Sequence, residues 1–405
     1  MPTMKRRTLA WGLIQVVGAV AWLVVRCALA PPPFTDLNQE LQRILSELVQ
    51  KDRSVKNCVL SVMAGDASLV WAGAAGIAHA NGQVPMTRDT PIYIASVTKL
   101  YTATTVMLLM EKGALSLDDP MAKYLPAGLI HGIHVYNGKD YSAEITIREL
   151  LSHSSGIADY YTERAGDGKN LFDRFLERPD RSWTVDETIA RARDDLRPNF
   201  PPGKGASYSD TNFQLLGKVI EAVTGKPLQV VYEEFLFGPL GLDHTWLIGY
   251  WRSPIAPLPS PADVFHADNS ITRIRSNGAY WAEGGIVSTA KEMNIFLKAL
   301  NEGKIIRPAS LKLMHDWRRL QFPLQYGYGT MYFKLPWPLS TLSQIPPLWG
   351  HSGSTGSFLY YSADYDLYMA GSIDQTESKI KPFTLMGKVM RAISVERARA
   401  KIRNR

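Results

Sequence analysis

Cysteine is scarce in this sequence, which contains only Cys27 and Cys58 among its 405 residues. A framework of structural disulfides is therefore not expected, and Cys58 is predicted to be a buried, unreactive thiol. The excess of positive charge is also small, because the sequence has 45 lysines and arginines and 38 aspartates and glutamates. No basic stripe is interleaved with aromatic residues, which argues against a nucleic-acid partner. A content of 45% hydrophobic and 20% charged residues is typical of a folded globular protein.

Signatures of several enzyme classes are missing as well. The string nearest to the G-x-S-x-G turn of lipase-type hydrolases, Gly350 to Ser354, lacks the last glycine. No H-E-x-x-H zinc motif occurs, and His131 and His134 lie in a loop-like context that suggests a chance pair. The Gly203-Lys204 pair lacks the upstream glycine of a phosphate-binding loop. Lipase-type, zinc-dependent and nucleotide-binding enzymes are therefore disfavoured.

One long apolar run is present near the N-terminus. Residues 9–25 are apolar except for Gln15 and follow the basic triplet Lys5-Arg6-Arg7. Ala28-Leu-Ala30 resembles a cleavage site, but Pro31 follows directly and opposes processing. We expect residues 1–33 to be a signal peptide or a membrane anchor, so that the protein is exported and is either secreted or in contact with the membrane.

Hydrophobic periodicity places strands near both ends of the chain and helices in the middle. The predicted strands cover residues 57–63, 68–77, 278–287, 326–334, 349–362 and 367–373. A first helix, capped by Thr35 or Asp36, is predicted through Lys51, with Leu37, Leu41, Ile44, Leu45 and Leu48 on one face, and a last helix is predicted from about Pro382. The predicted class is α/β (α+β): one antiparallel sheet formed by the N- and C-terminal segments, flanked by helices, in a domain of residues 34–390. A mostly helical lobe, about residues 118–275, is inserted, and residues 391–405 form a basic helix end.

The motif Ser96-Val-Thr-Lys99 lies at the start of a predicted amphipathic helix that ends near Lys112. A spacing of three places the hydroxyl and the ammonium one helical turn apart on one face. Serine requires a nearby base to act as a nucleophile, and a helix N-terminus favours a developing oxyanion. The plainer alternative is that Ser96 caps the helix and Lys99 is solvated.

Two later motifs contain further candidates. Tyr208-Ser-Asp210 lies in a turn-rich loop before a helix expected to begin near Phe213. A phenol beside a lysine is favoured in its ionised form and could accept the serine proton, while Asp210 is either a helix cap or a site residue. His351-Ser-Gly-Ser354 lies in a strand-forming context where small residues let a ligand approach a strand edge. Its alternative is a glycine-rich bend with a structural histidine.

In this order, the three motifs resemble those of the serine hydrolases that include class C β-lactamases, D-Ala-D-Ala carboxypeptidases and D-stereospecific peptidases and esterases, a penicillin-binding-protein-like family. Residues 150–156, 200–203 and 283–290 resemble the same family, and the resemblance covers roughly residues 35–390. It implies that Ser96 is acylated, that Lys99 and Tyr208 share its proton, and that no metal or organic cofactor takes part. It also implies that the backbone N–H groups of Ser96 and Ser354 form an oxyanion hole. The residues that it implies for substrate binding or for the oxyanion are Asp210, His351, Ser352, Gly353 and Ser354.

Two positions depart from that pattern. Asp210 occupies a position where asparagine is usual. His351 occupies a position where class C β-lactamases have lysine and D-peptidase-like members have histidine. A neutral imidazole attracts a substrate carboxylate less than an ammonium does. We therefore expect a D-Ala-D-Ala carboxypeptidase or D-peptidase-like enzyme acting on a small peptide, such as a cell-wall peptide. The alternatives are a class C-like β-lactamase, an esterase, or a penicillin-binding or peptidoglycan-sensing protein with little turnover.

Overall fold

The computed structural model describes residues 36–403, apart from residues 82, 250–258, 273–274, 322, 338–339, 341–344 and 379. The predicted signal peptide or anchor lies outside the described residues, as do the last two residues of the predicted basic end. Within the described part, no helix is both long and apolar enough to cross a membrane.

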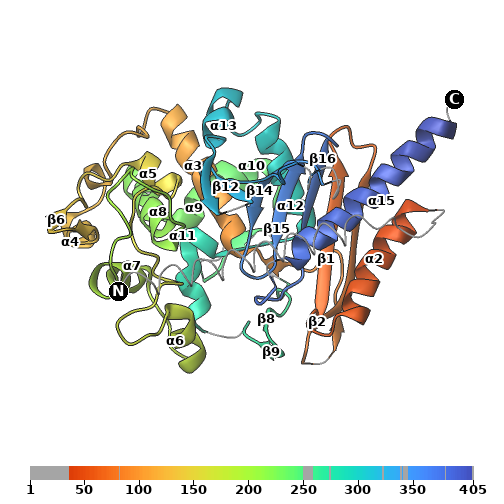
Figure 1. Ribbon diagram of the computed structural model, residues 1–405, viewed down its shortest axis with the longest axis horizontal. Helices are drawn as coiled ribbons and strands as arrows, with labels where there is room; N and C mark the ends of the chain where they lie inside the picture. The colour runs from red at the N-terminus through yellow and green to blue at the C-terminus, as the bar shows by residue number, and fades with distance from the viewer. Residues whose placement is uncertain are drawn as a thin grey trace.

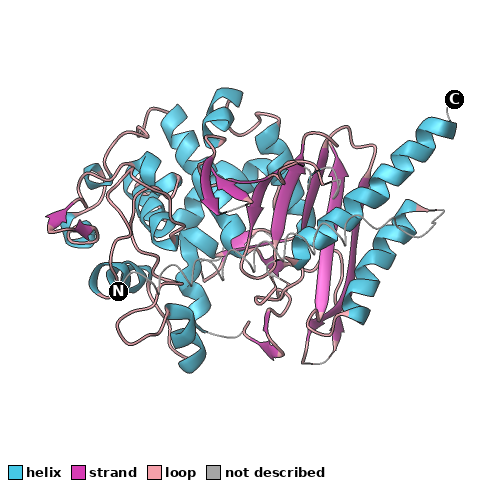
Figure 2. Ribbon diagram, in the orientation of Figure 1, coloured by secondary structure: helices cyan, strands magenta, loops and turns pink. Residues whose placement is uncertain are grey.

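A nine-stranded sheet joins the two ends of the chain, as predicted (Figures 1 and 2). Its order is β11-β12-β13-β14-β15-β16-β1-β2-β3. The N-terminal strands are β1 (Asn57–Ala64), β2 (Val70–His79) and β3 (Val84–Pro85). The C-terminal strands are β11 (Arg318–Gln321), β12 (Leu324–Tyr326), β13 (Met331–Phe333), β14 (Leu348–Ser352), β15 (Phe358–Ser362) and β16 (Leu367–Ser372). All pairs are antiparallel, and β1 meets β16 with Val59 opposite Ser372.

Helices cover both faces of the sheet. Helices α2 (Leu37–Lys51) and α15 (Lys381–Arg403) pack against one face, where Leu41, Leu60 and Met386 share an apolar core (Figure 1). Asp36 caps α2 by accepting a hydrogen bond from the Gln39 amide, one of the two caps expected from the sequence. Cys58 is a buried free thiol in this core, as predicted. Helix α12 (Ala290–Asn301) packs against the other face, and α13 (Pro308–Met314) follows it.

The inserted helical lobe contributes most of the remaining helices (Figure 2). They are α4 (Ala127–Ile130), α5 (Ile147–Leu151), α6 (Leu171–Glu177), α7 (Val185–Asp194), α8 (Asp210–Thr224), α9 (Leu228–Tyr232) and α10 (Gly238–Leu240), with single turns η2 (Met121–Lys123) and η3 (Glu233–Phe237). The same part of the chain contains two short hairpins. One pairs β5 (Val135–Tyr136) with β6 (Lys139–Asp140), and the other pairs β8 (Phe265–His266) with β9 (Asn269–Ser270).

The predicted amphipathic character of the helix after Ser96 is wrong. Helix α3 (Thr98–Glu111) contacts α8, α11 (Trp281–Gly284) and β14, so it is buried on nearly every side. Its threonines are accommodated because their hydroxyls find internal partners: Thr104 and Thr105 donate to carbonyls one turn earlier, and Thr102 contacts Tyr232 Oη at 2.6 Å. A central helix needs no polar face.

Three predicted strands are also corrected. Residues 349–362 form two strands, β14 and β15, with a turn between them. Residues 278–287 form mainly the turn η4 (Arg275–Tyr280) and helix α11, and only β10 (Ile286–Ser288) is extended. Strand β10 pairs with β4 (Ile92–Tyr93) and β7 (Trp246–Leu247) in a separate sheet. The predicted strand 326–334 is broken by a turn at residues 327–330, where Gly329 has a φ of 65° that disfavours other residue types.

Candidate active site

Ser96 lies on a tight turn that leads directly into a helix. The turn η1 (Ala95–Val97) continues into α3 at Thr98, and Ala95 adopts a φ of 45°, which is unfavourable for an alanine. Tertiary contacts hold this turn, because Ser357 Oγ donates to the Ile94 carbonyl at 2.7 Å and the Ile286 amide donates to Thr98 Oγ1 at 3.1 Å. The serine hydroxyl is therefore presented on a fixed backbone.

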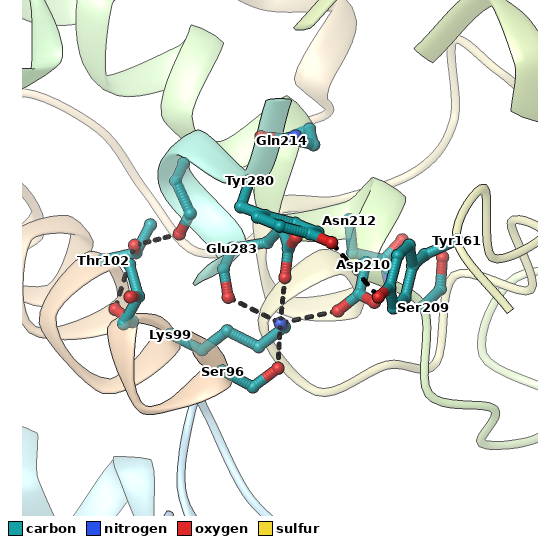
Figure 3. A network of polar contacts seen from close by, with 12 residues as sticks. Ser96, Lys99, Thr102, Tyr161, Ser209, Asp210, Asn212, Gln214, Tyr280 and Glu283 are labelled. Atoms are coloured by element: carbon teal, nitrogen blue, oxygen red, sulfur yellow. Dashed lines mark hydrogen bonds and ion pairs between the residues drawn. The ribbon is translucent and has the colours of Figure 1, made fainter. Parts of the chain in front are cut away.

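Lys99 is fully buried, so the alternative of a solvated lysine is wrong. Its Nζ donates to Ser96 Oγ at 3.0 Å, as the spacing of the two residues predicts (Figure 3). The ammonium also contacts Asp210 Oδ1 at 2.6 Å, Glu283 Oε2 at 2.8 Å and the Glu283 carbonyl at 2.7 Å. Two buried acids thus share one buried lysine.

Asp210 is a partner of Lys99 and not a helix cap. Helix α8 begins at Asp210, three residues before the expected start, and Ser209 occupies the cap position. The Asp210 amide donates to Asp159 Oδ1 at 3.1 Å, and its side chain turns toward Lys99 (Figure 3). Of the two roles left open by the sequence, the structure favours the site role.

Glu283 is a site residue that the motifs did not identify. It lies on α11, and Tyr160 Oη donates to its Oε1 at 2.9 Å while its Oε2 faces Lys99. The resemblance included residues 283–290 only as a matching stretch, and the predicted strand placed no catalytic cluster there. The available signal was an acidic residue within an otherwise apolar and glycine-rich segment.

Burial and ion pairing oppose one another in this cluster. Burial disfavours the charged form of Lys99, but the carboxylates of Asp210 and Glu283 outweigh it and place the pKa of Lys99 well above its ordinary value. Burial, with the nearby Asp210, raises the pKa of Glu283, and Lys99 only partly offsets this. The ammonium form of Lys99 is therefore the stable one.

Tyr208 is half-buried beside Lys99, whose Nζ lies 5.1 Å from the centre of the phenol ring. Its ring contacts His153 at a centroid distance of 4.3 Å. Burial raises the pKa of Tyr208, and the lowering effects of Lys99 and of hydrogen bonds to Ser96 and Lys99 do not compensate. Lys99 thus favours the phenolate, as expected, but burial of the phenol and the charge of Asp210 outweigh it, so Tyr208 keeps its proton in the free protein.

His351 is buried in β14 and is held by two hydrogen bonds. Its Nδ1 donates to the Ser352 carbonyl at 2.7 Å, and its Nε2 accepts from Tyr326 Oη at 3.1 Å. Burial and Lys99 lower the pKa of His351 to about 3, so the imidazole is neutral. Ser352 Oγ pairs with Tyr360 Oη at 2.8 Å, and neither His351 nor Ser352 belongs to the cavity lining. Their predicted substrate contacts stay predictions.

Gly353 allows the end of β14 to lie against the Ser96 turn. A Cβ atom on Gly353 would lie 2.2 Å from Ser357 Oγ and 2.5 Å from the Ile94 carbonyl oxygen, so a side chain has no room there. This close approach brings exposed Ser354 to the same cavity as Ser96. The predicted oxyanion role of these two backbone amides is consistent with this placement and stays a prediction.

A cavity of about 430 Å³ opens beside Ser96, Tyr208, Asp210 and Glu283. Its walls come from the helical lobe, from the β8–β9 region and from the loop after β14. Aromatic and aliphatic members of the lining are Tyr93, Tyr161, Phe172, Ile248, Val264, Ile271 and Tyr280. Glu377 adds a third carboxylate, and none of the described lining residues is a lysine or an arginine.

A sheet made from both chain ends, an inserted helical lobe and a serine one helical turn from a buried lysine define a serine hydrolase of the β-lactamase type. Residues 42–379 match the beta-lactamase family, and the chain belongs to it.

The relatives carry several different names. The chain is 28% identical over 313 residues to penicillin-binding protein 4 of Amycolatopsis lactamdurans, an alignment that covers 71% of this chain and 72% of the relative. It is 36% identical over 302 residues to a putative D-alanyl-D-alanine carboxypeptidase of Escherichia coli K12, covering 68% and 66% of the two chains. Among solved structures, a D-stereospecific amidohydrolase from Streptomyces sp. superposes with a TM-score of 0.71 at 27% identity, covering 87% of this chain and 98% of the other.

Proposed function

We propose that this protein hydrolyses amides or esters of D-amino acids, including small D-peptides, through an acyl-enzyme formed on Ser96. The observation that carries the proposal is the 3.0 Å contact between Ser96 Oγ and the buried Nζ of Lys99 at the edge of a cavity. A serine hydroxyl paired with an amine is the minimal arrangement for nucleophilic catalysis. Two relatives whose names refer to D-alanyl-D-alanine or to D-stereospecific hydrolysis support the choice of configuration.

The proposed reaction has two stages. In the first, Ser96 Oγ bonds to the substrate carbonyl carbon, its proton passes to Lys99 or Tyr208, and the carbonyl oxygen is stabilised by the backbone N–H groups of Ser96 and Ser354. The same proton then moves to the departing amine or alcohol as the tetrahedral intermediate collapses. In the second stage, water attacks the ester on Ser96 and releases the acid.

The cavity favours substrates without a carboxylate next to the scissile bond. Asp210, Glu283 and Glu377 make the described lining acidic, and the neutral His351 supplies no compensating charge. An aromatic wall that includes Tyr161, Phe172 and Tyr280 suits an apolar side chain. A D-amino acid amide with a free ammonium fits this charge and shape better than the C-terminal carboxylate of D-Ala-D-Ala.

A parallel kinetic comparison tests the proposal. Purified protein is assayed with D- and L-phenylalanine p-nitroanilide, N-acetyl-D-Ala-D-Ala, p-nitrophenyl acetate and a chromogenic cephalosporin. We expect the highest kcat/KM for the D-anilide and a mass increase confined to Ser96 when acylation is trapped. Preferred cleavage of N-acetyl-D-Ala-D-Ala would instead support a carboxypeptidase, and of the cephalosporin a β-lactamase. A stable adduct on Ser96 without turnover would indicate a penicillin-binding sensor.

A further inference from the structure

Lys99 contacts two buried acids as well as Ser96. Its Nζ donates to Ser96 Oγ and to both Oε2 and the carbonyl oxygen of Glu283, and Asp210 Oδ1 lies 2.6 Å away as an ion-pair partner. A lysine that activates a serine must be neutral at the moment of reaction, whereas two carboxylates favour its protonated form. The proposed reaction does not by itself account for the second carboxylate, Glu283.

The structure holds Glu283 rigidly in this position. Helix α11 packs so closely on α8 that a Cβ atom on Gly217 would lie 2.5 Å from Ala282 Cβ. Tyr160 Oη donates to the Glu283 carboxylate and also accepts from Gln214 Nε2 at 3.4 Å. Gln214 in turn donates to the Ala279 carbonyl at 2.7 Å. Such a supported, buried carboxylate is preorganised toward one partner, Lys99.

We propose that Glu283 is a positioning residue that, together with Asp210, keeps the proton on Lys99 in the free enzyme and thereby sets the pH at which Ser96 becomes active. The inference rests on the proposed function. Lys99 first releases its extra proton to solvent. The neutral amine then accepts the Ser96 hydroxyl proton while Oγ bonds to the carbonyl carbon and the carbonyl π pair moves onto oxygen.

Several other groups face the cluster and enter any pH dependence. Lys99 is surrounded by elements from both lobes, and each contributes a titratable side chain. These are Tyr208 and Asp210 around the start of α8, Asp159, Tyr160 and Tyr161 before α6, Tyr280 before α11, His153 after α5, Tyr326 on β12 and His351 on β14. Glu283 is the member that contacts Lys99 through both its carboxylate and its backbone carbonyl.

The test is the pH profile of Glu283→Gln. Removing one negative charge makes the ammonium less stable, so neutral Lys99 should appear at lower pH. We expect the rising limb of the plot of kcat/KM against pH to shift to lower pH by about one unit. At a given pH on that limb, kcat/KM should then be about tenfold higher, with KM changed little. An unshifted limb, or a loss of activity at all pH values in a folded variant, would overturn the inference.

Matched variants separate charge from structure. Glu283→Asp restores a carboxylate and should return the limb toward that of the wild type. Glu292→Gln removes another buried glutamate, which bonds Thr245 and His244 and does not contact Lys99, and should leave the limb unchanged. Tyr160→Phe withdraws one hydrogen bond from the Glu283 carboxylate and should move the limb down by a smaller amount. If Glu283→Gln does not fold, an unshifted Tyr160→Phe profile refutes the inference.

Labelling distinguishes this inference from the proposed function. Wild-type protein is treated with a fluorophosphonate at several pH values, and the adduct on Ser96 is measured by mass spectrometry. Absence of labelling and of turnover would refute the proposed function. Normal labelling and turnover in the wild type, with unshifted variants, would refute only the role of Glu283.

Discussion

Two groups of buried acids in this fold differ in whether a cation accompanies them. Asp210 and Glu283 share the ammonium of Lys99 between α3, α8 and α11. Asp374, just after β16, is equally buried, but Ser372 Oγ donates to its Oδ1 and no described residue bonds to its Oδ2. Burial accordingly raises the pKa of Asp374 to about 8, and Asp263 adds to the effect.

The difference shows two ways of burying an acid. Around Lys99 two acids share one buried ammonium, so their charge is tied to the chemistry of Ser96. At Asp374 the acid is instead neutral over much of the pH range, and its effect falls on stability. Removing Lys99 from the first group leaves two acids without a cation, whereas removing the acid from the second group relieves a burial penalty.

The largest effect on activity is expected for Ser96→Ala, which alters the reacting atom and leaves both acidic groups intact. Turnover should fall by about 10³ or more, because no other hydroxyl in the cluster occupies that position. The melting temperature should change little, since a small half-buried hydroxyl is lost. Rates measured with the best substrate, beside thermal melts of both proteins, check this. Retained turnover would rule out Ser96 as the nucleophile.

Lys99→Met should convert the first region into an unpaired acidic cluster like that of Asp374. We expect kcat/KM to drop by about 10² or more through loss of the base. We also expect unfolding free energy to fall by about 3 kcal/mol near pH 8, because two carboxylates lose their buried cation. Burial raises the pKa of Glu283, and loss of Lys99 removes the charge that opposes this, so stability should be retained at low pH and lost as the pH rises.

Urea denaturation of Lys99→Met at pH 5 and pH 8 measures the second effect. The gap to the wild type should be wide at pH 8 and narrow at pH 5. A variant as stable as the wild type at both pH values would show that the ion cluster does not support the fold. That outcome would leave the catalytic role of Lys99 to be judged from the kinetics alone.

Local sequence patterns predicted most of the fold. Helix α2 follows from the spacing of Leu41, Ile44 and Leu45 and from the cap at Asp36, and it was predicted to within a residue. Alternation and turn residues located β1 and β2. The segment before β10 was predicted incorrectly because its apolar residues are buried by packing on α3 and α8, a tertiary effect that mimics a strand.

The candidate site was predictable only where its geometry is local. The contact between Ser96 and Lys99 depends on one helical turn, so the spacing revealed it. The contact between Lys99 and Glu283 joins residues 184 positions apart and depends on how α11 packs, so no local pattern could show it. The neutral state of Tyr208 likewise depends on how the fold buries the phenol, with a further contribution from the charge of Asp210.

The smallest of these effects is expected for Asp374→Asn, which removes the uncompensated acid of the second region. The folded-state pKa of Asp374 lies above its unfolded value, so its contribution to stability is complete at low pH and is lost as the pH rises toward about 8. Asparagine cannot ionise and tolerates the φ of 43° at this position. The variant should therefore gain about 2 kcal/mol in unfolding free energy near pH 8 and little at pH 4.

Denaturation of Asp374→Asn across this pH range contrasts the two regions directly. Its advantage over the wild type should grow with pH, whereas the deficit of Lys99→Met should grow over the same interval. Turnover by Ser96 should keep its pH profile, because the substitution does not alter the charges that contact Lys99. A variant less stable than the wild type at pH 8 would mean that the Asp374 carboxylate has a compensating partner after all. Both regions would then stabilise their buried acids through a partner.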